Sequence, residues 1–237
     1  MRFMKYLLLK TFLIGSLSVA MITGCRKDYY VDSGLSTPSF DGNMLEFLQS
    51  KPYMFDTLVH IIKTAGLQSY FTDSTITFFA PADSSIRSTF LFINRNLRSL
   101  GHDTLTSVDN IKPEFWRNTL MMYMFRGARG MEHYPQLDMQ NLSSFSGEFV
   151  RSAGGRVMNV GVNYGDANGI KYIGYRSLYF SYIPNPAAPY QGWWSTRVAT
   201  SNVKPRNGYC HVLVFSTHYL GFDPQQTLAN AMYIGFQ

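Results

Sequence analysis

The cysteine content is the feature that most limits how this chain can fold. The sequence has 237 residues and two cysteines, Cys25 and Cys210. Cys25 ends a short apolar leader and is therefore not expected to be available to the domain. This leaves Cys210 without a partner for a disulfide or a cysteine-based zinc site. Hydrophobic residues make up 46% of the chain and charged residues 15%, which allows a sizeable core. We therefore expect a domain held together by packing alone, with Cys210 buried in the apolar run 209–215.

Residues 1–24 have the features of a secretory signal peptide. An apolar stretch over about 11–22 follows the basic residues Arg2, Lys5 and Lys10. The stretch is shorter than the ~20 residues that a membrane-spanning helix needs. The sequence Ile22-Thr23-Gly24-Cys25 is similar to the lipobox of bacterial lipoproteins, in which the cysteine receives a diacylglyceryl group and becomes the first mature residue. Cys25 is therefore the expected lipidation site, and an ordinary cleaved signal with a chance cysteine is the alternative.

The segment 25–41 contains Ser, Thr, Gly and Pro and is expected to be a flexible tether. Its start, Arg26-Lys27-Asp28, resembles the signal that sends some lipoproteins to the outer face of the outer membrane. Two or more acyl chains on Cys25 would anchor the protein stably in a membrane. We therefore expect a surface-exposed outer membrane lipoprotein of a Gram-negative bacterium, with display on the periplasmic face as the alternative.

The charge of the chain gives no support for nucleic-acid binding. Three of the 21 Lys and Arg residues lie in the leader, and the remaining 18 oppose 15 acidic residues, a formal net charge of +3. No cluster of basic residues follows the leader.

Patterns of catalytic residues are also missing. The sequence has no Gly-rich phosphate loop, His-Glu-x-x-His helix or Gly-x-Ser-x-Gly elbow. Cys210 and His211 are neighbours on a predicted strand and point to opposite faces, so they cannot form a nucleophile–base pair. We expect no enzyme activity, no metal ion and no cofactor.

The hydrophobic pattern predicts helices early in the chain and short strands late. Helices are expected over about 43–51, 52–65 and 83–100 and from 113 to about 124. Strands are expected at 75–81, 145–150, 156–162, 170–174, 178–183 and 210–215. This order is typical of an α+β protein with a mainly antiparallel sheet. Residues 223–237 show no clear pattern and are interpreted as a C-terminal extension.

Two sequence boxes resemble the signatures of fasciclin (FAS1) domains. The first, at 77–86, is a strand that leads through Ala80-Pro81-Ala82-Asp83 into a helix. The second, at 201–213, has an Asn207-Gly208 turn before a strand that carries His211. The resemblance covers residues 42–222. It implies a β-sandwich-like core with an N-terminal helical layer, and a non-catalytic extracellular role in adhesion or in binding a protein or glycan partner.

The motif residues have structural interpretations. Asp83 would cap the helix that follows Pro81, and Asn207-Gly208 suits a tight turn with positive φ. His211 is expected to be a structural histidine, hydrogen-bonded to the backbone or a hydroxyl. Members of the family often have a Tyr-His pair, implicated in adhesion, at the end of the middle helix. Here the pair reads Tyr123-Met124.

An aromatic-rich insert at about 170–200 is the candidate partner-binding segment, and its proline-containing part is expected to be largely loop. Tyr190, Trp193 and Trp194 are the candidate contact residues, because aromatic rings with polar handles suit sugar faces and protein interfaces. The alternative is that the aromatic residues near 172–182 pair across strands and fill the sheet.

Three functions remain open at this point. The chain could be an adhesion module for a cell, a matrix glycan or an envelope protein. It could be an accessory glycan-binding lipoprotein of an outer-membrane polysaccharide uptake system. It could also be a purely structural envelope protein.

Overall fold

Helices form the first part of the domain, where apolar residues recur at helical spacing. The structure is a computed structural model that describes residues 39–236, so the leader, Cys25 and the first part of the tether lie outside the described residues. The first helices are α2 (Met44–Gln49), α3 (Pro52–Thr64) and α4 (Gln68–Thr72). Pro52 occupies the first turn of α3, where its missing N–H costs no hydrogen bond. The expected pair of helices that meet at Pro52 is confirmed.

The tether is shorter than predicted. Ser39 forms a parallel bridge to Lys204. The Phe40 ring packs on Phe47 of α2 with ring centres 5.5 Å apart. The chain therefore contacts the domain from residue 39, whereas the tether was expected to extend to residue 41.

The strands form one seven-stranded sheet in the order β2-β1-β7-β6-β5-β4-β3. Only β1 and β7 pair in parallel, and the other neighbours pair antiparallel. The expected α+β class with a mainly antiparallel sheet is confirmed. The strands are β1 (Ile76–Ala80), β2 (Met124–Arg126), β3 (Glu148–Arg151), β4 (Val157–Tyr164), β5 (Arg176–Tyr182), β6 (Trp194–Val203) and β7 (Gly208–Leu213).

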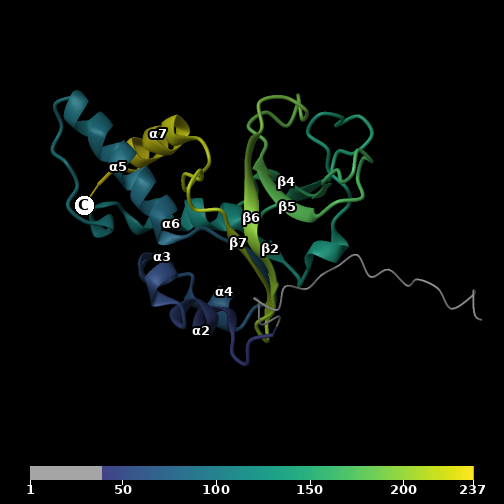
Figure 1. Ribbon diagram of the computed structural model, residues 1–237. Coiled ribbons are helices and arrows are strands. Elements are labelled where there is room, and N and C mark those ends of the chain that lie inside the picture. Colours follow the sequence, from purple (N-terminus) through teal and green to yellow (C-terminus); the bar gives the residue numbers. More distant parts are fainter. Residues whose placement is uncertain (1–38, 237) are drawn as a thin grey trace, which may run out of the picture. The chain divides into compact units, whose positions relative to one another are not determined.

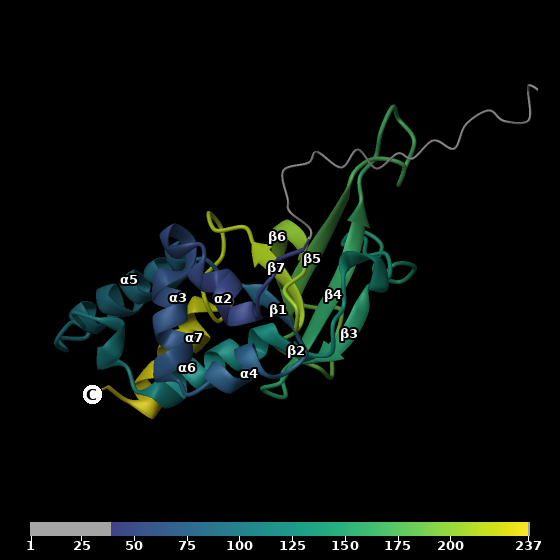
Figure 2. The ribbon, with the colours of Figure 1, turned by 90° about the horizontal axis from the view of Figure 1, so that it is seen from below.

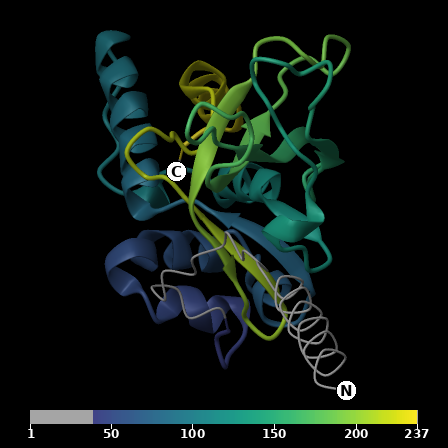
Figure 3. The same cartoon turned by 45° about the vertical axis from the view of Figure 1, so that its right-hand side comes forward.

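The sheet curls into a nearly closed barrel-like sandwich. Its two outer strands meet at one point, where the Ala153 N–H just after β3 donates to the Met124 carbonyl of β2 (2.8 Å). The later helices are α5 (Asp83–Ser99), α6 (Pro113–Leu120) and α7 (Pro224–Ile234). They lie on the same side of the sheet as α2, α3 and α4 (Figure 1). Strands β3, β4 and β5 lie on the side away from these helices (Figure 2). Figure 3 shows the same separation, with the purple and blue helices on one side of β7 and green loops on the other.

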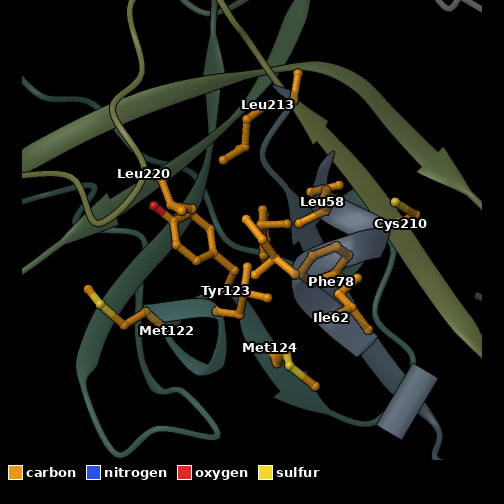
Figure 4. Packing of buried hydrophobic residues seen from close by; sticks show 14 of the residues in the cluster. Leu58, Ile62, Phe78, Met122, Tyr123, Met124, Cys210, Leu213 and Leu220 are labelled. Carbon is orange, nitrogen blue, oxygen red and sulfur yellow. The ribbon is translucent and has the colours of Figure 1, made fainter. Parts of the chain in front are cut away.

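Adjacent residues of the central strands serve two different cores. Phe78 of β1 faces the helices, where its ring meets Phe71 at 4.9 Å, and Figure 4 shows it beside Leu58 and Ile62 of α3. Phe79 faces the inside of the curled sheet and stacks on Phe180 of β5 at 4.3 Å. Both phenylalanines are fully buried. Each such ring contributes about 1.5–3 kcal/mol by leaving water, so packing can replace the missing disulfide.

Several elements differ from the prediction. Residues 170–174 form a loop rather than a strand, and a Cβ on Gly174 would lie only 2.8 Å from the Gly165 carbonyl oxygen. The middle helix ends at Leu120, and Met124 begins β2 because it pairs with Phe78 of β1. Strand β6 was missed because polar residues, such as those at 195–197 and 200–202, occupy much of its length.

The C-terminal segment 223–237 was also predicted wrongly as patternless, because it contains helix α7. Asp223 caps this helix by accepting the N–H groups of Gln225 and Gln226, and Pro224 occupies its first turn. Leu228 and Ala231 are buried. These start signals are visible in the sequence, but the apolar face is too narrow to show the helical period.

A buried tyrosine–histidine pair joins the end of the middle helix to the segment before α7. The Tyr123 hydroxyl lies 2.9 Å from His218 Nε2 and accepts the Gly221 N–H at 2.7 Å. In Figure 4 this hydroxyl points towards the segment of Leu220. Burial lowers the pKa of His218 from 6.5 to about 3, so the ring stays neutral in the fold. His218 is 95 residues from Tyr123 in sequence, so it was not predicted as a partner.

We expect the protein to lose stability in mild acid because of His218. The unfolded chain binds a proton below pH 6.5 and the folded chain does not, so the free energy of unfolding falls as the pH drops from 6.5 towards 3. Between pH 7.5 and pH 5 the contribution of one such histidine is about 2 kcal/mol. Urea unfolding at both pH values measures it. His218→Gln, which does not titrate, should reduce the pH dependence by this amount, and an unchanged dependence would contradict the assignment.

Gly208→Ala should destabilise the protein through a direct clash. A Cβ at this position would lie 1.7 Å from the Ile76 carbonyl oxygen, because β1 and β7 approach closely here. We expect a loss of about 1–3 kcal/mol in the free energy of unfolding or a failure to fold. Gly155→Ala is the matched control, since Gly155 also has positive φ but no atom within 4 Å of its Cβ position. Equal losses of unfolding free energy in the two variants would show that the positive φ angle, rather than the clash with Ile76, causes the destabilisation.

Candidate partner-binding surface

Strand β7 holds His211 and Cys210 on opposite faces, where they serve separate cores. His211 is fully buried, with Nε2 3.0 Å from the Arg129 carbonyl oxygen and Nδ1 3.2 Å from the Asn202 backbone nitrogen. Nε2–H therefore donates and Nδ1 accepts the Asn202 N–H. Burial lowers the pKa of His211 to about 4, and it raises the pKa of the Cys210 thiol well above its usual range. His211 thus ties β7 to the segment that follows β2.

Asp83 does not cap its own helix, so that prediction is wrong. Ala82 holds the cap position and Asp83 is the first residue of α5. The Asp83 carboxylate instead accepts the backbone N–H groups of Thr57 and Leu58 in α3, both at 2.9 Å. Pro81 is buried directly after the end of β1. The first box therefore joins a central strand to two helices.

Asn207 joins the second box to the helical layer. Its side-chain oxygen accepts the Met44 N–H at 2.8 Å, and its amide nitrogen donates to the carbonyl groups of Phe71 and Ser74. Gly208 next to it is required mainly by the close approach of Ile76 and less by the turn. The Asn-Gly pair is thus a junction between β7, β1 and the first helices.

Residues 39–236 contain neither a metal-binding cluster nor a membrane-spanning helix. Within this range no group of three or more His, Cys, Asp or Glu side chains is placed to hold a metal ion. In the same range no helix has the length and apolar character to cross a membrane.

The aromatic residues of the insert divide into a buried and an exposed set. Phe180 lies on β5 inside the curled sheet, as the core interpretation of 172–182 expects. The proline-containing part of the insert is a loop as predicted, because residues 183–193 have no strand or helix and connect β5 to β6. Trp194 begins β6 opposite Tyr182 and is 42% exposed.

Tyr190, Trp193 and Phe149 form an aromatic cluster at this connection. The Phe149 ring of β3 meets Tyr190 at 5.8 Å and Trp193 at 5.7 Å, both edge to face. Trp193 Nε1 donates to the Pro189 carbonyl, which fixes the indole. Tyr190 is 54% exposed, and Phe149 and Trp193 are half-buried. Phe149 was not predicted as a member, since it is distant in sequence from the insert.

A comparison with known protein families agrees with the two boxes. The Fasciclin domain family model matches residues 53–213, a span that contains both boxes. A solved FAS1 domain pair from the insect cell adhesion molecule Fasciclin I is similar at 13% identity and a TM-score of 0.35. That match covers 76% of this chain and 45% of the other, so this chain spans less than half of the domain pair. No curated protein matches the sequence. Since the family model covers more than half of its length, the chain belongs to the fasciclin (FAS1) domain family.

Proposed function

We propose that this protein is a membrane-anchored, extracytoplasmic lipoprotein whose FAS1 domain mediates adhesion by binding a protein or glycan partner. FAS1 domains are associated with adhesion or binding. The observation that carries the proposal is the partly exposed aromatic cluster of Phe149, Tyr190 and Trp193, which is followed in sequence by the exposed Trp194. Tyr and Trp are the residues most often found at the energetic centre of binding surfaces.

The cluster is suited to binding because its rings are already held in place. Phe149 lies on a strand, and Trp193 is fixed by its hydrogen bond to Pro189 one residue before β6 begins. Side chains that are ordered before binding lose little conformational entropy when a partner arrives. A surface of this kind can hold a ligand without rearrangement of the sheet.

Anchoring through Cys25 is the second part of the proposal. It is supported by the leader 1–24 and by the likeness of Ile22-Thr23-Gly24-Cys25 to a lipobox. The outer membrane of a Gram-negative bacterium, with display at the cell surface, remains the proposed location.

We also propose that the protein has no catalytic activity. Cys210 is buried and its thiol has a raised pKa, so it is poorly available as a nucleophile. His211 uses both ring nitrogens for backbone contacts.

A role as an accessory glycan-binding lipoprotein of a polysaccharide uptake system is the second candidate. The observation that favours it is the edge-to-face arrangement of rings around Phe149, which leaves aromatic surface free for a sugar.

Replacement of the aromatic cluster should weaken binding. We expect Trp193→Ala and Tyr190→Ala to reduce the affinity for cells or matrix by about tenfold or more, the usual cost of losing a central aromatic residue. Tyr233→Ala is the matched control, because Tyr233 is a 91% exposed aromatic residue on α7. Binding of purified protein to immobilised cells or matrix measures the effect. Unchanged affinity in folded Trp193→Ala and Tyr190→Ala proteins would remove the cluster from the proposal.

Lipidation at Cys25 has its own test. In cells, Cys25→Ser should move the protein from the membrane fraction to the soluble fraction, because the two or more acyl chains expected on Cys25 supply the binding energy. Mass spectrometry of the wild-type protein should find a modified N-terminal cysteine. An unmodified thiol at Cys25, or equal membrane association of the variant, would contradict this part.

A further inference from the structure

The two outer strands of the sheet enclose a slot, closed at both ends. Arg126 of β2, two residues after Met124, and Arg151 of β3, two residues before Ala153, both line this slot. No ladder joins β2 to β3 among the described strand pairs, and these two strands end the sheet order. At the far end the Arg129 guanidinium bridges the gap to Glu148 with contacts of 2.8 and 2.6 Å.

The slot is a cavity of about 610 Å³, a size typical of small-ligand sites. Phe125, Tyr134 and Val150 line its inner wall, and the Phe125 ring packs on Phe79 inside the curled sheet. Because side chains alternate along a strand, Arg126 and Arg151 point to the outer side. Both arginines are exposed. In Figure 2, β2 and β3 lie next to each other on the side of the domain away from α5.

The slot carries positive charge that its own residues do not neutralise. Glu148 is occupied by both terminal nitrogens of Arg129. Among the described residues, no ion pair includes Arg126 or Arg151, and Arg151 donates to the Gly155 carbonyl at 2.9 Å. Two guanidinium groups that line one cavity repel each other, because they carry like charges. An anionic group between the two guanidinium groups would relieve this repulsion through charge-assisted hydrogen bonds.

The aromatic cluster adjoins this charged slot. Phe149 lines the slot and also contacts Trp193 and Tyr190. On β3, Phe149 and Arg151 are two residues apart and therefore lie on the same face. If a ligand places its anionic group at Arg126 and Arg151, a ring next to that group lies within reach of the aromatic cluster.

The shape of the slot favours a ring over a peptide strand. A strand added between β2 and β3 would need them about 10 Å apart along its whole length, since neighbouring strands are spaced at about 4.8 Å. The two edges instead make direct contact at Ala153 and Met124, and the Arg129–Glu148 pair closes the other end about five residues away. A single sugar ring with its carboxylate fits this enclosure.

We propose that the slot between β2 and β3 binds a uronate residue of an acidic polysaccharide, with the carboxylate between Arg126 and Arg151 and the sugar ring against Phe149. This inference rests on the proposed function and narrows its partner to an acidic glycan.

The test compares the binding of an acidic oligosaccharide with that of its neutral methyl ester. The full chain, purified in detergent, is titrated with oligogalacturonate and with the same oligomer as its methyl ester, which keeps the rings and removes the charge. Wild-type protein should bind the acid at least about tenfold more tightly than the ester, in line with two charge-assisted hydrogen bonds. Arg126→Gln/Arg151→Gln should lose this preference without a fall in melting temperature.

The control variant is Arg87→Gln/Arg95→Gln, which removes the same charge from exposed positions on α5 and should keep the preference. Loss of the preference in the control as well, no preference in the wild type or no binding of the acid overturns the uronate assignment. Polyglutamate that binds as tightly, with the same dependence on Arg126 and Arg151, overturns the choice of a sugar.

The failure of this inference can be told apart from the failure of the proposed function. If oligogalacturonate and its methyl ester bind with equal affinity and Trp193→Ala abolishes the binding of both, the uronate site is overturned. Glycan binding at the aromatic cluster then still stands. If neither oligomer binds and the protein also fails to attach to cells or matrix, both are overturned.

Discussion

The parallel pairing of β1 with β7 is the contact on which the rest of the domain depends. It joins Ile76 to Gly208 across more than half of the chain, and it places the two family boxes side by side. One face of this pair carries Phe78 and Cys210 towards the helices, and the other carries Phe79 and His211 into the curled sheet. Both cores are therefore built on the same two strands.

Polar contacts secure this pair at its ends. Asn207 bonds to α2 and to the segment before β1, and Asp83 just after β1 bonds to α3. Residues that sequence reasoning treats as turn and cap signals act here as junctions between elements. Their side chains satisfy backbone groups of distant segments, which a local pattern cannot reveal.

Sequence reasoning predicted the fold class, the family resemblance and the early helices, because local signals determine them. Pro52 and the apolar spacing of α3 are sufficient to place that helix. It failed for β2, whose three residues follow a helix directly and become a strand only by pairing with β1. The exposed cluster was predicted in part: Tyr190 and Trp193 stand out in the insert, whereas Phe149 joins them only through the fold. The position of Arg126 and Arg151 at one cavity likewise depends on how the sheet curls.

The β1–β7 pair also sets the moment at which the domain can form. Its second strand ends at Leu213, so β1 lacks its parallel partner until the chain has been synthesised as far as this residue. Contacts between residues so far apart in sequence form slowly, because a long loop must close first. A chain made from its N-terminus can therefore pair β3, β4, β5 and β6 with one another before β1 gains its parallel neighbour, so the parallel pair of the sheet is completed last.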